Sequence, residues 1–150
     1  MVKTVVLLLL LAGISLAVEV DLHSPRAAVA SYYAAMNEGD LTAMEQTMVQ
    51  DSYDLDVQVY ALSIAFQDKT FRTILKQYKE SREAREIVKK EVEKKLRDRP
   101  KKRATSLRVM ETGDARALLR FREEGKPKQL YLSRQDGCWK IDYLAGRKRH

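Results

Sequence analysis

The spacing of apolar residues changes near residue 104, and this change sets the fold class. Before it, apolar side chains recur every three to four residues, as Val29, Tyr32, Tyr33 and Met36 do, which is the period of an amphipathic helix. After it, apolar and polar residues alternate, which is the period of a half-buried strand. A run of helices followed by a run of strands predicts an α+β domain.

Capping residues place the boundaries of the helices. Ser24 and Pro25 supply an N-cap and a first-turn proline, and Gly39 can end that helix in a left-handed conformation. Asp40 then caps a second helix, whose apolar positions reach Val49. Later helical patterns cover 71–78 and 84–96, and the last of them ends before a proline at position 100.

The segment 51–66 fits two secondary structures. Leu55, Val57 and Val59 alternate with polar residues, as in a short strand. Val59, Leu62 and Phe66 also fit a helix that continues onward. The pattern leaves strand and helix open for this segment.

Four short strands are expected after residue 104. Turns at Gly113-Asp114, at 124–127 and at Asp136-Gly137 separate them. Strands joined by tight turns predict an antiparallel meander, and the preceding helices are expected to cover one of its faces.

The first seventeen residues have the pattern of a signal peptide. Lys3 precedes an uncharged apolar run over residues 4–16, and small residues at 15 and 17 mark a cut between Ala17 and Val18. An uncleaved anchor and a buried helix are the alternatives, but a spanning helix needs about 20 apolar residues. We therefore expect a periplasmic or secreted protein with no transmembrane segment in its mature form.

The remainder divides into a mobile N-terminus (18–23), one domain (24–145) and a basic tail (146–150). The single cysteine, Cys138, excludes an internal disulfide framework. Its two interpretations are a buried small apolar side chain and an intermolecular disulfide or reactive thiol.

Three segments resemble the nuclear-transport-factor-2-like superfamily, and in particular its small secreted bacterial domains of unknown function. They are SPRAAVASYYAAMNEGDL (24–41), LRVMETGDARALLRF (107–121) and LYLSRQDGCWKIDYL (130–144). The resemblance implies a cystatin-like roll, in which N-terminal helices pack on a curved four-stranded sheet around a cone-shaped cavity. It also implies that two copies can pair through the sheet. Residues 69–103 depart from a compact member because they are long and highly charged.

The implied cavity suggests a ligand site. The side chains expected to line it are Tyr33, Met36, Phe121, Tyr131 and Trp139. In this superfamily such a cavity can be empty, ligand-binding or catalytic, so the fold alone does not assign the function.

An isomerase-like or hydratase-like enzyme is the second hypothesis. Such chemistry needs a carboxylate base in an apolar cavity and a hydrogen-bond donor for the developing oxyanion. Asp51 and Asp54 are the candidate bases, and Tyr33 or Tyr131 the candidate donor. The alternative is that both carboxylates are solvated loop residues. No nucleophile motif or phosphate-binding loop is present, and no cofactor is implied.

Two basic clusters suggest a third hypothesis. They are Lys101, Lys102 and Arg103, and Arg147, Lys148 and Arg149, in a chain of net charge +7. Such clusters bind anionic headgroups or phosphates, although a charge run is usually a solvated face. In an exported protein, envelope lipid or an acidic partner is favoured over nucleic acid. Asp21 and His23 are too few for a metal site, and none is expected.

These observations favour an exported, non-enzymatic domain of the cell envelope. It would bind a small ligand or a partner protein through its cavity or its sheet face. The enzyme and the basic surface binder remain the alternatives.

Overall fold

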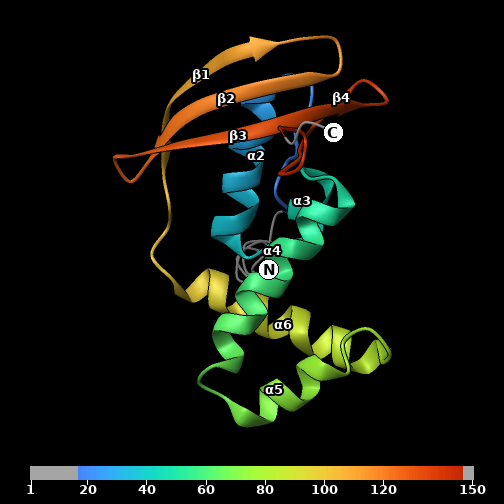
Figure 1. Cartoon of the computed structure of the whole chain (residues 1–150). Coiled ribbons are helices and arrows are strands. Elements are labelled where there is room, and N and C mark those ends of the chain that lie inside the picture. The colour runs from blue at the N-terminus through green and yellow to red at the C-terminus, as the bar shows by residue number, and fades with distance from the viewer. Residues whose placement is uncertain (1–16, 147–150) are drawn as a thin grey trace, which may run out of the picture.

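A computed structural model describes residues 17–146 as an α+β domain with five helices before a four-stranded antiparallel sheet (Figure 1). The helices are α2 (Pro25–Glu38), α3 (Leu41–Gln46), α4 (Gln50–Ala65), α5 (Lys69–Lys76) and α6 (Arg82–Asp98). The strands are β1 (Ala104–Thr112), β2 (Arg116–Glu123), β3 (Lys126–Gln135) and β4 (Cys138–Ile141). The predicted fold class and the order of its elements are therefore confirmed.

The predicted caps are present at both ends of α2 and at the start of α3. Ser24 accepts a hydrogen bond from the Ala27 amide at the start of α2, and Gly39 ends α2 at a φ of 65°. Asp40 caps α3 by accepting from the Ala43 amide. These bonds satisfy amides that a helix start leaves without an intrahelical partner.

The second helix is shorter than the sequence predicts, because α3 ends at Gln46. Met48 instead forms a parallel bridge with Ile141. The Val49 amide donates to the Ile141 carbonyl, and the Ile141 amide donates to Thr47. These bonds pair the free edge of β4, which would otherwise expose backbone donors and acceptors.

The segment for which the sequence left strand and helix open is a helix, since α4 covers Gln50–Ala65. Tyr53, Val57 and Ala61 recur at every fourth position and are buried. Leu55 and Val59 lie on the opposite, exposed face of α4. The strand-like alternation arises because this helix carries apolar residues on two faces.

The charged middle of the chain forms α5 and α6. Asp68 caps α5 by accepting from the Phe71 amide, and Ser81 caps α6 by accepting from the Ala84 amide. α6 buries one narrow stripe against the other helices, made of Ala84, Val88, Val92 and Leu96.

The sheet has the order β1-β2-β3-β4, with every neighbouring pair antiparallel. The turns Glu124-Gly125 and Asp136-Gly137 have positive φ at both residues, as a two-residue hairpin turn requires. The first of these predicted turns is tighter than expected, since β3 already starts at Lys126.

The two faces of the sheet differ in character. The inner face carries the buried residues and packs against α2; its buried members are Ala117, Leu119, Phe121, Leu132, Trp139 and Ile141. The outer face carries the alternate residues, which include Arg108, Arg116, Arg120, Arg122, Tyr131, Ser133 and Lys140.

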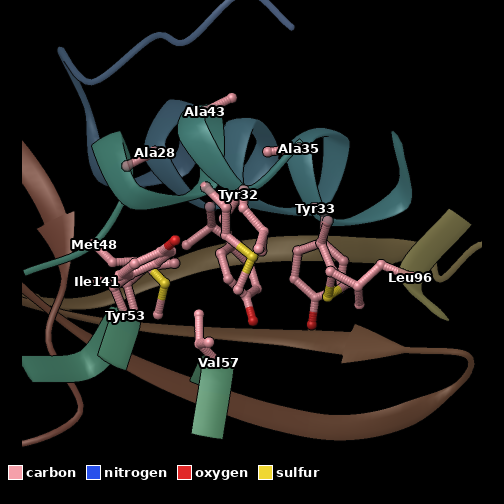
Figure 2. Close-up of a cluster of buried hydrophobic side chains, with 14 of the residues drawn as sticks. Ala28, Tyr32, Tyr33, Ala35, Ala43, Met48, Tyr53, Val57, Leu96 and Ile141 are labelled. Atoms are coloured by element: carbon pink, nitrogen blue, oxygen red, sulfur yellow. The ribbon is translucent and has the colours of Figure 1, made fainter. Parts of the chain in front are cut away.

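The core lies between α2, α4 and the inner face. Figure 2 shows Tyr32 and Tyr33 leaving α2 side by side, with both hydroxyls directed away from the helix. Their rings meet edge to face at 5.4 Å, and Tyr33 meets Phe121 in the same way at 5.7 Å. Edge-to-face contacts of this kind stabilise a core beyond the area that they bury.

The segment 18–23, expected to be mobile, makes hydrogen bonds to the domain. The Leu22 carbonyl accepts from the Trp139 amide, and the Asp21 amide donates to the Ser31 hydroxyl. Residues 1–16 of the expected signal peptide and 147–150 of the basic tail lie outside the described residues. Across residues 17–146, no helix is long and apolar enough to cross a membrane.

Candidate functional site

Four of the five residues expected to line a cavity are buried core residues. Tyr33, Met36, Phe121 and Trp139 are packed among the side chains of the inner face and α2. Tyr131 is half-buried on the outer face, where it pairs with Leu118 across the strands. The structure therefore does not bring these five side chains together around one opening.

A carboxylate lies among tyrosine hydroxyls beside the core. Tyr32 of α2 donates to Asp56 Oδ2 at 2.7 Å, and Tyr143, which follows β4, donates to Asp56 Oδ1 at 2.8 Å. Asp56 is on α4, so these bonds join α2, α4 and the chain after the sheet. We call Tyr32, Asp56 and Tyr143 the tyrosine–aspartate cluster.

Burial shifts the proton equilibria of this cluster. Desolvation raises the pKa of Asp56, against the lowering effect of the two hydroxyl donors and of Arg99. Desolvation also raises the pKa of Tyr32 and of Tyr143, and the nearby carboxylate adds to both shifts. All three groups thus favour their protonated forms more than exposed groups would.

Arg99 places a positive charge near the cluster. Its guanidinium lies over the ring of Tyr60, 5.2 Å from the ring centroid, which is the geometry of a cation–π contact. The Nε and Nη2 atoms of Arg99 are enclosed and form no hydrogen bond to a described residue. Both Asp56 oxygens already accept a hydroxyl, so the cluster holds elements together rather than presenting a free base.

An open groove lies at one end of the sheet, where β2 begins, β3 ends and the chain continues after β4. We call it the outer groove. It consists of a hollow of about 580 Å³ and a neighbouring one of about 380 Å³, and Arg116 and Ala145 line both. The larger hollow has a volume typical of small-molecule sites.

The outer groove collects polar groups of both charges. Arg116 and Arg134 line the larger hollow together with Asp51 and Asp142. Ser133 also lines it, and the Ser133 hydroxyl is enclosed without a hydrogen-bond partner among the described residues. A buried polar group without a partner costs free energy.

The strand β2 makes the outer face positive next to this groove. Arg116, Arg120 and Arg122 are separated by even numbers of residues and therefore share that face, and Arg108 of β1 is directly opposite Arg120. None of these four arginines forms an ion pair with a carboxylate of residues 17–146.

The candidate bases lie in different surroundings. Asp51 is exposed in the first turn of α4 and lines the larger hollow, while Tyr131 lines the smaller one. Asp54 accepts a hydrogen bond from Gln50 at 2.9 Å. Tyr33 donates to Glu123 at 2.8 Å in the core. The structure thus brings Asp51 and Tyr131 to one groove and leaves Asp54 and Tyr33 outside it.

Sequence reasoning gave no site role to Asp56 or Ser133, and it grouped Arg116 only with the basic residues of the first hairpin. The alternation of β2 and β3 placed Arg116 and Ser133 on the polar face, but it gave no sign of a groove there. The groove depends on Ala145 and Gly146 folding back against that face, and the Gly146 backbone lies close against the ring of Tyr131.

The first basic cluster is partly neutralised by carboxylates. Lys101 pairs with Glu38 at 2.8 Å, and Lys102 lies 3.7 Å from Glu123. The second cluster, 147–149, is outside the described residues. Between residues 17 and 146 no group of three His, Cys, Asp or Glu side chains could hold a metal ion, and the Asp21 carboxylate pairs with the His23 ring.

Comparison of this chain with protein-family models, with curated proteins and with solved structures found no match.

Proposed function

We propose that this is a non-enzymatic binding domain that holds a small polar ligand in the outer groove. The observation that carries the proposal is the larger hollow, of about 580 Å³, which Arg116 and Arg134 line together with Asp51 and Asp142. The ligand chemistry that fits is an anionic group at the arginines joined to a hydrogen-bond donor for Asp51 or Asp142. Amino acids and short peptides have this combination.

Electrostatics supports an anionic end on the ligand. The arginines of β2 raise the positive potential along the outer face, and a charge-assisted hydrogen bond to a guanidinium is stronger than a neutral one. Asp142 Oδ1 accepts from the Leu144 amide, which holds this carboxylate at the rim of the groove and leaves its second oxygen for a donor.

The groups of the outer groove support binding better than catalysis. Asp51 is exposed to solvent, whereas a general base needs a substrate held within hydrogen-bond reach. The buried carboxylate, Asp56, is occupied by two hydroxyls instead. The isomerase-like alternative therefore has a weaker basis than ligand binding.

Isothermal titration calorimetry tests this proposal with diglycine as the probe. We expect wild-type protein to bind diglycine, and Arg116→Gln to bind it at least about tenfold more weakly, since a hydrogen bond to a charged group contributes about 1.5–3 kcal/mol. Acetate and ethylamine, which each carry one of the two charges, should bind more weakly than diglycine.

Arg108→Gln is the matched control for this experiment. It removes the same charge from the same face, but Arg108 does not line either hollow. Equal losses in the two variants would show a general electrostatic effect and contradict a site at Arg116. Absence of diglycine binding to the wild type would reject this ligand class.

The setting of this function remains part of the proposal. The apolar run at 4–16 and the small residues before Val18 support an exported protein of the cell envelope. The order of helices and strands is also the order in the nuclear-transport-factor-2-like superfamily, which the sequence resembles. That membership, like the cystatin-like curvature of the sheet, is proposed on the motifs alone.

A further inference from the structure

α4 and its C-cap residue carry a line of large apolar side chains that are exposed to solvent. Leu55, Val59, Leu62 and Phe66 are 48%, 55%, 51% and 81% exposed. Their spacing of three or four residues puts them on one face, over roughly 16 Å of helix. We call these four residues the apolar stripe. Scattered exposed apolar residues are normal in proteins, but a continuous line of them indicates an interaction site.

The charges on the C-terminal side of the apolar stripe are mostly positive. Residues 57–67 contain no charged side chain, and residues 69–79 contain four cations and no anion. The carboxylates nearest to the stripe in sequence are Asp54 and Asp56, which flank Leu55, and Asp68, which caps α5. The four cations, Lys69, Arg72, Lys76 and Lys79, are all exposed. None of them forms an ion pair with a carboxylate of the described chain.

Arg72, Lys76 and Lys79 lie beside the stripe, because they line hollows that Leu62 also lines. Lys76 lines a hollow of about 430 Å³ with Leu62, Phe66 and Leu75, and a second one of about 260 Å³ with Leu62. The Arg72 guanidinium donates to the Ala65 carbonyl through both Nε and Nη2. This holds its charge at the end of α4, next to Phe66.

We propose that the apolar stripe and the cations of α5 dock this domain on an anionic lipid bilayer. The apolar side chains would enter the boundary between headgroups and acyl chains, while the lysines and Arg72 meet lipid phosphates. A nucleic acid would meet the cations but has no place for four exposed apolar side chains. A second copy paired symmetrically across the stripe would bring two sets of like charges together.

This docking surface differs from the basic clusters that the sequence suggested. Lys101 and Lys102 form ion pairs with carboxylates, at 2.8 and 3.7 Å, whereas the cations at 69–79 form none with a described residue and adjoin an apolar face. On α4 and α5 the apolar and the basic components occur together. A bilayer surface recognises this combination, because each component alone binds it weakly.

Co-sedimentation of the full chain with vesicles tests the proposal. The probes are vesicles of equal parts phosphatidylglycerol and phosphatidylcholine, and vesicles of phosphatidylcholine alone. We expect binding to the anionic vesicles that weakens at least about tenfold in Leu62→Gln/Phe66→Gln, and to a similar extent in Lys69→Gln/Lys76→Gln/Lys79→Gln. The apolar run 4–16 is identical in all these proteins, so its own contribution cancels.

Two matched controls lie elsewhere on the surface. Met110→Gln/Leu144→Gln removes two apolar side chains that are 47% and 45% exposed outside the stripe. Arg108→Gln/Arg120→Gln/Arg122→Gln removes three exposed cations from the outer face of the sheet. Both controls should bind like the wild type. Trp139 fluorescence reports whether each variant is folded, because its indole is buried in the core.

A second measurement locates the inserted residue directly. In Phe66→Trp, brominated phosphatidylglycerol should quench the new indole, while in Met110→Trp it should not. Equal quenching in both proteins, or none in either, would overturn the proposal. Unchanged vesicle binding by Leu62→Gln/Phe66→Gln would also overturn it. A third contrary result would be a wild-type protein that does not bind vesicles but forms a dimer in sedimentation analysis, with the dimer lost in that variant.

Discussion

At the scale of single residues, Asp56 makes stability depend on pH. Burial raises its pKa above the ordinary value of 3.8, so the folded state holds this proton more strongly than the unfolded chain. The unfolding free energy contributed by Asp56 therefore falls as pH rises from near 3.8 through the higher folded pKa, and is constant above it.

Asp56→Asn should remove this pH dependence. The amide is neutral at every pH, and its oxygen can still accept from one of the two tyrosines. Urea unfolding from pH 3.5 to 8 should show the wild type losing stability relative to the variant as pH rises. Asp114→Asn, which changes an exposed carboxylate in a turn, should leave the wild-type profile unchanged. Parallel profiles for wild type and Asp56→Asn would contradict the interpretation.

The same residue shows where sequence-based prediction of the site ends. If 51–60 were a strand, Asp54 and Asp56 would share one face and would be equivalent candidates. In a helix they point in different directions, and Asp56 lies one turn from Tyr60. Choosing the buried carboxylate thus requires both the secondary structure of α4 and the position of Tyr143, which comes from the other end of the chain.

At the scale of elements, α2 and α6 approach closely at Gly39. A Cβ atom there would lie 2.6 Å from the Glu93 carbonyl oxygen and 2.6 Å from Arg97 Cγ. Gly39 also has a φ of 65°, which costs a residue with a side chain roughly 1–2 kcal/mol. Two separate penalties therefore meet at one position.

Gly39→Ala should destabilise the domain by more than the backbone cost alone. Gly125→Ala provides the comparison, because Gly125 has a φ of 78° and nothing within 4 Å of the added Cβ. We expect Gly125→Ala to lose about 1–2 kcal/mol of unfolding free energy and Gly39→Ala to lose more, measured by urea denaturation. Equal losses would show that α6 moves away from the added methyl group at no cost.

Local signals predicted most elements, and long-range pairing decided the rest. Ser24, Gly39 and Asp136-Gly137 act within a few residues, so their caps and turns could be identified from the sequence. The end of α3 could not, because Thr47 and Val49 pair with Ile141, over ninety residues away. α4 was ambiguous for a different reason, since its exposed apolar stripe resembles a second buried face.

At the scale of the whole molecule, the apolar stripe begins near the outer groove and runs away from it along α4. Asp51 of the groove lies one turn before Leu55, the first residue of the stripe, whereas Phe66 at its other end lies next to α5. Figure 1 places the sheet at one end of the molecule and α5 at the other, so a bilayer that contacts Phe66 and the cations of α5 lies at the end away from the sheet. The arginines of the outer face disfavour the homodimer that the sequence suggests through the sheet. Two such faces brought together would place like charges opposite each other, which is unfavourable, unless an anionic ligand lies between them.

The cut expected after Ala17 would also change an interaction of the folded domain. The Val18 nitrogen lies 3.4 Å from Asp40 Oδ2. Cleavage would turn this amide into a charged α-amino group and so convert a weak hydrogen bond into an ion pair. The Asp40 carboxylate would then both cap α3 and bind the new α-amino group, which would hold the first residue of the mature chain in place.

N-terminal sequencing after expression in a secreting host tests this maturation. We expect the extracytoplasmic protein to begin at Val18, because residues 4–16 are apolar and uncharged and residues 15 and 17 are small. Leu8→Arg/Leu9→Arg places two charges in that run and should leave the protein inside the cell, still beginning at Met1. A wild-type protein that begins at Met1 in the cytoplasm would refute export, and a different first residue would remove the proposed ion pair with Asp40.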